Sequence, residues 1–297
     1  MTINMEEKDW TICSVLDWTA DYFSRNGLPE SRIEAEVLLS HVLSCPRLQL
    51  HLKKDEKVPA RELSRFSRLI LERRKRKPAA YLTGEKEFMG LSFKVNENTL
   101  IPRPETELLV EEAISRLNGK KDIIAADIGA GCGNIAVSIA KLADIQKLYA
   151  SDVSAAALYT AQENVFRHGL GARIVLKQGN LFDALAGENL ENGLDLIVSN
   201  PPYVALEESG MLEPELKYEP EIALFGGNDG LDFYKRIAAQ AVSYMKSRGV
   251  LIVELNARKS MAIRDIFEKA GYRVETVIKD YSGFDRIMTM TVRNNNG

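Results

Sequence analysis

Residues 123–134 read IIAADIGAGCGN, an apolar run that leads directly into a glycine-rich loop at 129–133. The apolar run is typical of a buried strand, and a helical pattern follows the loop. Glycine allows a sharp turn and the close approach of a ligand to the backbone, and the helix N-terminus beyond the loop offers free N–H groups. This stretch therefore predicts a strand, a ligand-binding loop and a helix in succession.

The spacing of the glycines indicates which ligand the loop would bind. A dinucleotide site requires the pattern G-x-G-x-x-G, but the sixth position here is Asn134. The pattern that is present, G-x-G-x-G, is used more for S-adenosylmethionine, which has no pyrophosphate to be held. By itself the loop is also compatible with an ordinary glycine turn of an α/β protein.

Outward from this unit, apolar runs alternate with helical patterns. The runs predict buried parallel strands at 123–128, 147–151, 173–177, 194–199 and 249–254. Helical patterns occupy 133–143, 154–168, 231–246 and 258–270, and two β-like stretches, 272–280 and 284–292, predict a C-terminal hairpin. We therefore expect an α/β fold with a doubly wound, mostly parallel sheet of seven strands.

The first part of the chain differs, with helical periodicity and little β character over residues 10–77. We expect a small helical bundle over 1–80 and a β-hairpin connector over 81–101, where EFMGLSFKV alternates apolar and polar residues around a glycine. Residues 102–297 would form the α/β domain that carries the chemistry. Thr106 or a neighbour would cap its first helix.

Two positions that follow predicted strands fit a nucleoside. Asp152 ends the second strand, ~20 residues after the glycine loop, where an acidic residue can accept hydrogen bonds from two ribose hydroxyls. The alternative is a helix cap, a role that Ser154 could fill equally well. After the third strand, Asn180 and Leu181 lie where a sheet of this order would place an adenine ring.

The fourth predicted strand ends in Asn200-Pro201-Pro202-Tyr203. Open α/β sheets bind ligands beyond the carboxyl ends of their strands. The two prolines lock the backbone and remove two N–H donors, which leaves the Asn200 side-chain oxygen and the Pro201 carbonyl oxygen as acceptors. Such a site suits a flat substrate with an NH2 group, against which Tyr203 would pack. The alternative is a rigid turn without a function.

Transfer of a methyl group to such an NH2 group would need no His or Cys nucleophile. An amide nitrogen is a poor nucleophile, but hydrogen bonds to both of its hydrogens and an enforced in-line approach would favour a more pyramidal nitrogen. The three His residues have no paired ligand spacing, and the three Cys residues form no CxxC pair. We therefore expect neither a metal nor a disulfide.

Composition excludes several classes of protein. The 39 Lys and Arg residues against 42 Asp and Glu residues give a net charge of −3, which excludes a globally basic nucleic-acid binder. No run of 18 apolar residues is present, so no membrane span is expected. The few, widely spaced cysteines suit a reducing compartment. We expect a cytoplasmic monomer that binds neither a membrane nor a stable nucleic acid.

Two charged stretches allow more than one interpretation. The basic run RRKRK at 73–77 could contact RNA or an acidic protein surface, or it could be a solvated helix end favoured by the helix dipole. Acidic residues gather at 207–221, in either a solvated loop or a face for a basic partner.

The NPPY sequence at 200–203, the GAGCG loop and IPRPETE at 101–107 together resemble the bacterial peptide chain release factor glutamine methyltransferases. The resemblance covers nearly the whole chain, including YLTGEKEFMGLSFKV at 81–95 and ALFGGNDGLDFY at 223–234. NPPY alone is shared with adenine-specific DNA methyltransferases. IPRPETE with the helical domain is more specific, and the related ribosomal-protein glutamine methyltransferases usually depart from it.

The resemblance implies a class I methyltransferase domain behind a helical recognition domain. The reaction would move a methyl group from S-adenosylmethionine to the side-chain nitrogen of the glutamine in the Gly-Gly-Gln motif of class 1 release factors. Asn200, Pro201, Pro202 and Tyr203 would bind the glutamine, with Asn200, Pro201 and Tyr203 as the catalytic residues, and Arg103 would help to shape the cofactor pocket. The resemblance assigns cofactor binding to Gly129, Ala130, Gly131, Cys132, Gly133, Asp152, Asn180, Leu181 and Asn200.

Two rival functions remain at this point. An N6-adenine nucleic-acid methyltransferase would present a flipped base to the same acceptors, although no target-recognition domain is evident. A non-catalytic module that binds a cofactor or RNA through residues 73–77 is the second. One stretch departs from the family pattern: after Glu254 the chain reads LNARKSMAI in place of a Gly-His-x-Gln-Gly-like sequence. We expect this loop to lie away from the central motif.

Overall fold

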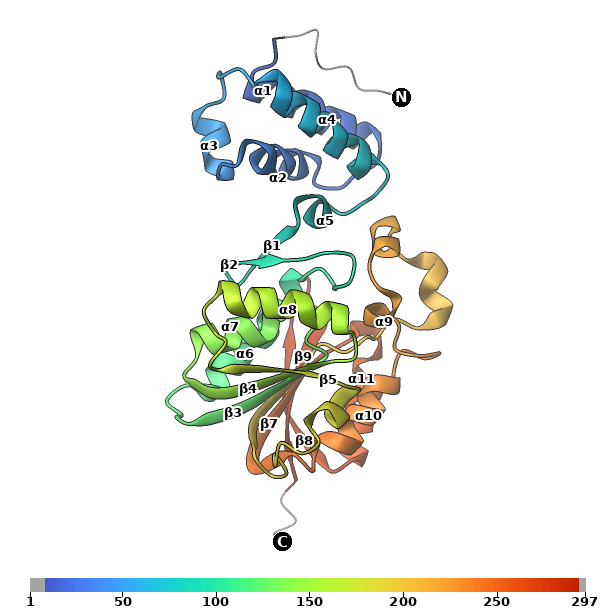
Figure 1. The fold of residues 1–297 in the computed structure, drawn as a ribbon. Coiled ribbons are helices and arrows are strands. Elements are labelled where there is room, and N and C mark those ends of the chain that lie inside the picture. Colours follow the sequence, from blue (N-terminus) through green and yellow to red (C-terminus); the bar gives the residue numbers. More distant parts are fainter. Residues whose placement is uncertain (1–8, 294–297) are drawn as a thin grey trace. The chain divides into compact units, whose positions relative to one another are not determined.

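The computed structural model describes residues 9–293 (Figure 1). The chain divides into two compact units. Of the described residues, one unit contains 9–85 together with 213–218, and we call it the helical unit. The other contains residues 86–212 and 219–293, and we call it the sheet unit.

The helical unit is built around one apolar core. Val15, Leu16 and Phe23 pack against Leu38 and Phe66, and all five side chains are buried. Full burial of such a side chain contributes about 1.5–3 kcal/mol, so this core is the main source of the unit's stability. The helices of the unit's N-terminal stretch are α1 (Ile12–Arg25), α2 (Ser31–Leu43), α3 (Arg47–Leu52), α4 (Ala60–Arg74) and α5 (Ala79–Thr83).

The basic run at the end of α4 is largely used inside the helical unit. The buried Arg73 guanidinium donates to Glu34 through Nε at 2.6 Å and to Glu215 through Nη2 at 2.9 Å. Arg76 donates to the Gly27 carbonyl oxygen, and the Tyr218 hydroxyl donates to the Lys75 carbonyl oxygen at 2.8 Å. A solvated helix end is therefore wrong for Arg73, because two carboxylates replace its water. One of these two carboxylates, Glu215, belongs to the acidic stretch and lies in η3 (Pro214–Tyr218).

The sheet unit contains a seven-stranded sheet of order β5-β4-β3-β6-β7-β9-β8, in which only β9 runs antiparallel to its neighbours. This confirms the predicted doubly wound, mostly parallel sheet and its C-terminal hairpin. A separate two-stranded hairpin precedes it, formed by β1 (Glu85–Phe88) and β2 (Leu91–Lys94). The strands of the large sheet are β3 (Ile123–Ile128), β4 (Ile145–Asp152), β5 (Ile174–Gln178), β6 (Leu194–Ser199), β7 (Met245–Glu254), β8 (Tyr272–Lys279) and β9 (Asp285–Val292).

Helices cover both faces of the large sheet, and successive strand residues face opposite layers (Figure 1). Ala125 packs in the layer of α6 (Pro104–Leu117), α7 (Asn134–Leu142) and α8 (Ala155–Arg167). Ala126 packs in the layer of α10 (Asp232–Ala241) and α11 (Ser260–Lys269). Short elements complete the unit: η1 (Leu181–Leu185), η2 (Leu206–Met211), α9 (Glu221–Leu224) and η4 (Ala257–Lys259).

β7 is four residues longer than predicted. β7 begins at Met245 rather than at 249, and α10 ends at Ala241 rather than at 246. The early part of β7 contains the exposed residues Ser247 and Arg248, so a search for a continuous apolar run misses it.

Within residues 9–293, no helix has both the length and the apolar character needed to cross a membrane. The same residues contain no group of three or more His, Cys, Asp or Glu side chains that could hold a metal ion. All three cysteines are free.

Candidate active site

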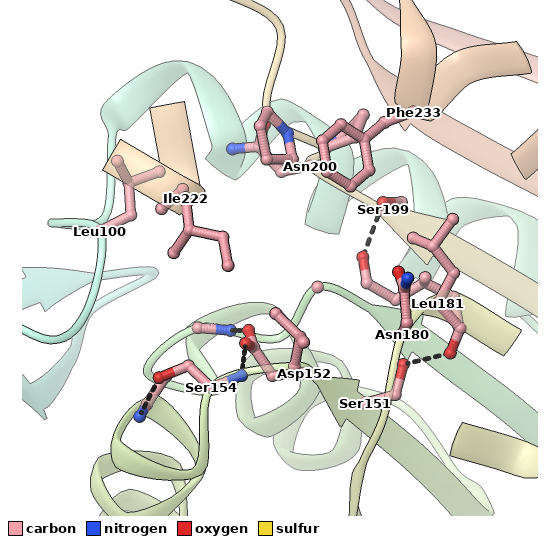
Figure 2. Close-up of a pocket in the computed structure, with 18 of the residues that line it drawn as sticks. Leu100, Ser151, Asp152, Ser154, Asn180, Leu181, Ser199, Asn200, Ile222 and Phe233 are labelled. Atoms are coloured by element: carbon pink, nitrogen blue, oxygen red, sulfur yellow. Dashed lines mark hydrogen bonds between the residues drawn. The ribbon is translucent and has the colours of Figure 1, made fainter. Parts of the chain in front are cut away.

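A cavity of about 250 Å³ lies at the carboxyl ends of the central strands. The strand order reverses between β3 and β6, and the crevice at such a switch point is where open α/β sheets bind ligands. Figure 2 shows Asp152 on one side of the cavity and Asn200 on the other. The residues that line the cavity are Asn98, Thr99, Leu100, Ile128, Gly129, Gly131, Ser151, Asp152, Val153, Ser154, Ala157, Gly179, Asn180, Leu181, Ser199, Asn200, Pro201, Pro202, Pro220, Ile222, Ala223, Phe233 and Arg236.

The glycine loop and Asp152 are tied to each other. The Gly131 backbone N–H donates to Asp152 Oδ2 at 2.8 Å, and the Ser154 backbone N–H donates to Oδ1 at 2.9 Å. Ser154, not Asp152, caps α8, because its hydroxyl accepts from the Ala157 N–H. A carboxylate has about four acceptor sites, so Asp152 keeps capacity for two ligand hydroxyls. Burial raises the pKa of Asp152, an effect that its backbone hydrogen bonds oppose.

Asn180 and Leu181 follow β5 and line the same cavity. Leu181 has φ of 52°, a left-handed conformation that a branched residue rarely adopts. The Ser151 hydroxyl of β4 donates to the Leu181 carbonyl oxygen at 3.3 Å and ties the start of η1 to β4 (Figure 2). Strained backbone of this kind is characteristic of binding sites.

Asn200 is held by a hydrogen-bond chain that starts in α6. Its Nδ2 group donates to Thr106 Oγ1 at 3.2 Å, and the Thr106 hydroxyl donates to Glu254 Oε2 at 2.6 Å. The expected capping role of Thr106 is wrong: Arg103 precedes the helix without a side-chain cap, and the Thr106 hydroxyl is directed to the buried carboxyl at the end of β7. Nearby, the Ser199 hydroxyl donates to the Ile128 carbonyl oxygen at 2.6 Å, which joins the ends of β6 and β3.

Tyr203 is fixed at both ends. Its hydroxyl lies 3.5 Å from Glu254 Oε1, and its carbonyl oxygen accepts from Asn256 Nδ2 at 3.2 Å. Asn256 belongs to the atypical loop after Glu254, so the expectation that this loop lies away from the central motif is wrong. The two are neighbours because β6 and β7 are adjacent parallel strands whose carboxyl ends meet.

The stretch at 223–230 supports the NPPY turn through backbone contacts. The Val204 N–H donates to the Leu224 carbonyl oxygen, and the Gly226 N–H donates to the Val204 carbonyl oxygen, both at 2.9 Å. A Cβ atom on Gly226 would lie 2.4 Å from the Pro202 carbonyl oxygen. Close approach of the two backbones therefore requires glycine at this position.

Three buried groups near the cavity have strongly shifted pKa values. Burial raises the pKa of both Asp127 and Glu254 to about 7, so each carboxyl can change its protonation near neutral pH. Asp127 accepts from the Ala136 N–H at 3.1 Å. Burial also raises the pKa of the Cys132 thiol to about 12, so Cys132 carries no thiolate at neutral pH.

The cavity brings together most of the residues that the sequence singled out. Gly129, Gly131, Asp152, Asn180, Leu181, Asn200, Pro201 and Pro202 line it. Within the described residues, the lining does not include Ala130, Cys132, Gly133 or Tyr203. Arg103 pairs with the buried Glu219, which also accepts from the Ile101 N–H at 3.0 Å.

Several cavity residues were missed by the sequence reasoning. Leu100 and Ile222 lie along one flank and Phe233 along another (Figure 2). The Arg236 guanidinium lies 5.7 Å from the centre of the Phe233 ring. Phe233 falls within the quoted stretch at 223–234, whereas Leu100 lies in a loop and Ile222 in the short helix α9, and neither belongs to a motif.

The lining of the cavity suits a nucleoside. Asp152 has free acceptor capacity for ribose hydroxyls, and Leu100, Leu181, Ile222 and Phe233 provide apolar surface for a base. The glycine loop lies beside Asp152, and its residues Gly129 and Gly131 have no side chain beyond a hydrogen atom. Asn200 lies across the cavity from Asp152, and Pro201 belongs to the same lining.

Two family models match the chain, one over its helical N-terminal part and one within its α/β part. Residues 14–84 match the PrmC N-terminal domain, and residues 104–213 match the methyltransferase small domain.

Among solved structures, the chain is similar in fold to the hMettl16 catalytic domain in complex with MAT2A 3'UTR hairpin 6. That match has a TM-score of 0.56 and 16% identity, and covers 81% of this chain and 86% of that one. A methyltransferase from Pyrococcus furiosus matches with a TM-score of 0.52 and 20% identity over 69% of this chain and 91% of that one. At these identities the likeness concerns the fold alone.

Similarity in sequence is much closer to one group of enzymes. The release factor glutamine methyltransferase of Geobacter sulfurreducens is 39% identical over 94% of this chain and 96% of its own length. The enzyme of that name from Rhodopirellula baltica is 37% identical over 98% and 99%, and the one from Aquifex aeolicus is 33% identical over 87% and 90%. The chain therefore belongs to the release factor glutamine methyltransferase family.

Proposed function

We propose that this protein transfers a methyl group from S-adenosylmethionine to the side-chain amide nitrogen of the glutamine in the Gly-Gly-Gln motif of class 1 peptide chain release factors. The observation that carries the proposal is the placement of Asn200 across one cavity from Asp152, with Pro201 in the lining of the same cavity. One side of this cavity suits a nucleoside, and the other side offers acceptors to an NH2 group.

The cofactor would be held by residues at the ends of β3, β4 and β5. Asp152 would accept hydrogen bonds from the ribose hydroxyls, the loop at 129–133 would hold the amino-acid part of the cofactor, and Asn180 and Leu181 would hold its base. When bound, S-adenosylmethionine supplies an electrophilic methyl group on a sulfonium. The Gly131 and Ser154 N–H groups already orient the Asp152 oxygens. Cofactor binding therefore has to order this side chain very little.

The substrate glutamine would be held at the end of β6. Asn200 Oδ1 and the Pro201 carbonyl oxygen accept its two amide hydrogens and orient the nitrogen lone pair toward the cofactor. Fixed acceptors favour the more positive nitrogen of the transition state over the planar ground state. The nitrogen becomes strongly acidic once methylated, so its proton can leave to solvent. Packing of the Tyr203 ring against the substrate amide stays a prediction. In the structure, the Tyr203 hydroxyl lies beside the Glu254 carboxyl group.

The helical unit would recognise the body of the release factor, as its match to the PrmC N-terminal domain supports. The proposed domain division is a helical bundle at 1–80, a hairpin connector at 81–101 and a catalytic domain at 102–297. A translation factor as substrate places the reaction in the cytoplasm. We further expect a monomer that needs no stable nucleic acid, which light scattering of the purified protein would test.

The test is direct methylation. The full chain is incubated with S-adenosylmethionine and a purified class 1 release factor, and the tryptic peptide that contains Gly-Gly-Gln is analysed by mass spectrometry. We expect a mass increase of one methyl group, localised to the glutamine by fragmentation.

Two controls separate the rival functions. A release factor with Gly-Gly-Ala in place of Gly-Gly-Gln should remain unmodified, and double-stranded and single-stranded DNA should acquire no label. Methylation of DNA without methylation of the release factor would replace the proposed function with adenine methylation. No transfer to any substrate, with cofactor binding retained, would favour a binding module.

A further inference from the structure

The Thr106 hydroxyl bridges two groups that are far apart in the sequence. It accepts from Asn200 Nδ2 at 3.2 Å and donates to Glu254 Oε2 at 2.6 Å. Thr106 lies in the first turn of α6, Asn200 follows β6, and Glu254 ends β7. Both Thr106 and Glu254 are buried, at 2% and 1% exposure, so water does not compete for these bonds.

The direction of these bonds decides which atom of Asn200 faces the ligand. An ionised carboxylate can only accept, so the Thr106 proton must go to Glu254. The Thr106 oxygen is then left to accept, and it takes a hydrogen from Asn200 Nδ2. Since the amide is planar, fixing its Nδ2 end fixes its Oδ1 end as the acceptor presented to the cavity.

We infer that Thr106 and Glu254 are positioning residues that hold the acceptor oxygen of Asn200 toward the reacting amide, an inference that rests on the proposed function. Neither residue touches the reacting atoms in this scheme. Their contribution is to exclude the flipped amide, which would present Nδ2 to the substrate N–H groups and repel them.

The surroundings of Glu254 make this arrangement sensitive to pH. The Tyr203 hydroxyl, Arg286 of β9, Arg103 and Glu105 act on the carboxyl group, and the Tyr234 hydroxyl of α10 donates to the Glu254 carbonyl oxygen at 2.9 Å. Burial raises the pKa of Glu254 to about 7, and Arg286 and Arg103 act in the opposite sense. A protonated Glu254 can donate to Thr106, whose own proton is then available to Asn200 Oδ1. The fixed orientation of the amide is lost at low pH.

Two variants of Thr106 test the hydrogen-bond chain from Glu254 through Thr106 to Asn200 by their effect on turnover. Thr106→Val keeps the shape and removes the hydroxyl, and we expect kcat for the release factor to fall about 10- to 100-fold, because small misplacements of reacting groups have effects of that size. Thr106→Ser keeps the hydroxyl and should restore kcat to within about threefold of wild type. The Kd for S-adenosylmethionine should stay unchanged in both, as measured by calorimetry.

The pH profile separates positioning from a merely structural role. In the wild type, kcat should rise with pH through about 7, as Glu254 ionises. Glu254→Gln cannot ionise and keeps an acceptor for Thr106, so its kcat should lose this rise. A wild-type profile in Glu254→Gln, or wild-type kcat in Thr106→Val, would overturn the inference.

A measurement without substrate tests the hydrogen-bond chain from Glu254 through Thr106 to Asn200 even if the proposed function is wrong. The side-chain NH2 signals of Asn200 in ¹⁵N-labelled protein are identified by their loss in Asn200→Ala. We expect them to shift and to exchange faster with solvent in Thr106→Val but not in Thr106→Ser, while the rest of the spectrum shows a preserved fold. Unchanged Asn200 signals in Thr106→Val would mean that this hydrogen-bond chain does not exist. Absence of methylation in wild type would instead refute the proposed function alone.

Discussion

Arg73 Nη2 and Glu215 Oε1 lie 2.9 Å apart, although 142 residues separate them in the chain. Arg73 belongs to α4, and Glu215 belongs to the segment 213–218 that leaves the sheet unit after the NPPY turn and returns at 219. The helical unit therefore contains a piece of chain that is covalently continuous with the substrate end of the proposed active site. An ion pair with a buried guanidinium holds that piece in place.

Arg73→Ala should destabilise the helical unit by about 3–5 kcal/mol, because it leaves Glu34 as a partly buried, unpaired carboxylate and leaves Glu215 only its longer ion pair with Arg76 at 3.5 Å. Urea unfolding followed by tryptophan fluorescence would measure this, since Trp10 and Trp18 belong to the core of that unit. The exposed neighbour Arg74 provides a matched control, and Arg74→Ala should change stability by less than about 0.5 kcal/mol. Equal effects of the two variants would contradict the structural role of Arg73.

Asn200→Ala should lower kcat about 10²- to 10³-fold, the usual result of removing one preorganised contact to a transition state. Steady-state methylation of a release factor measures the change, and calorimetry with the cofactor shows whether the pocket is intact. Turnover near the wild-type value would show that Asn200 does not orient the substrate amide.

Asp152→Ala should weaken binding of S-adenosylmethionine more than it changes kcat at saturating cofactor, because the carboxylate faces the cavity and the loop rather than the NPPY turn. Loss of hydrogen bonds from a charged acceptor is worth about 1.5–3 kcal/mol each, so a tenfold or larger rise in Kd is expected. Asp265→Asn, at an exposed position of α11, is the control. An unchanged Kd in Asp152→Ala would remove the ribose assignment.

Gly226→Ala should reduce kcat about tenfold or more while cofactor affinity is retained. Its added methyl group would lie 2.4 Å from the Pro202 carbonyl oxygen, so the NPPY turn must shift. Gly210→Ala is the matched control, because a Cβ atom there has nothing within 4 Å. If both variants turn over like wild type, the turn tolerates displacement and its rigidity is not required.

Stability should depend on pH through Asp127. Burial raises its pKa in the folded protein from the ordinary 3.8 to about 7, so folding favours the protonated form. This stabilising contribution is complete below about pH 4 and is lost as the pH rises through about 7, with a total of a few kcal/mol. Glu254 acts in the same direction.

Asp127→Asn removes the titrating group, so the fall in the urea midpoint between about pH 5.5 and about pH 8 should be smaller than in wild type. Asp265→Asn should leave that fall unchanged. An identical pH dependence in Asp127→Asn and wild type would show that Asp127 is ionised throughout this range in the folded protein.

Much of the architecture could be predicted from local sequence. Continuous apolar runs locate parallel strands that are buried on both faces, and the glycine loop and NPPY follow strands whose carboxyl ends must meet at one edge of a parallel sheet. The positions of Asp152, Asn180 and Asn200 around one cavity follow from that rule together with the strand order. The start of β7 was missed because its exposed Ser247 and Arg248 interrupt the apolar pattern.

The sequence by itself determined the class of fold, the family and the short motifs, because these depend on residues that are close together in the chain. Only the tertiary structure decided what surrounds them. The residue type and position of Thr106 predict a helix cap, but its hydroxyl donates to Glu254, which is 148 residues away in the chain. The basic run is compatible both with a solvated helix end and with a contact to RNA or an acidic protein surface, but Arg73 is buried against Glu215 of the same chain. A polar side chain bonds to whatever partner the fold brings within about 3 Å, and no local pattern encodes a partner that is distant in sequence.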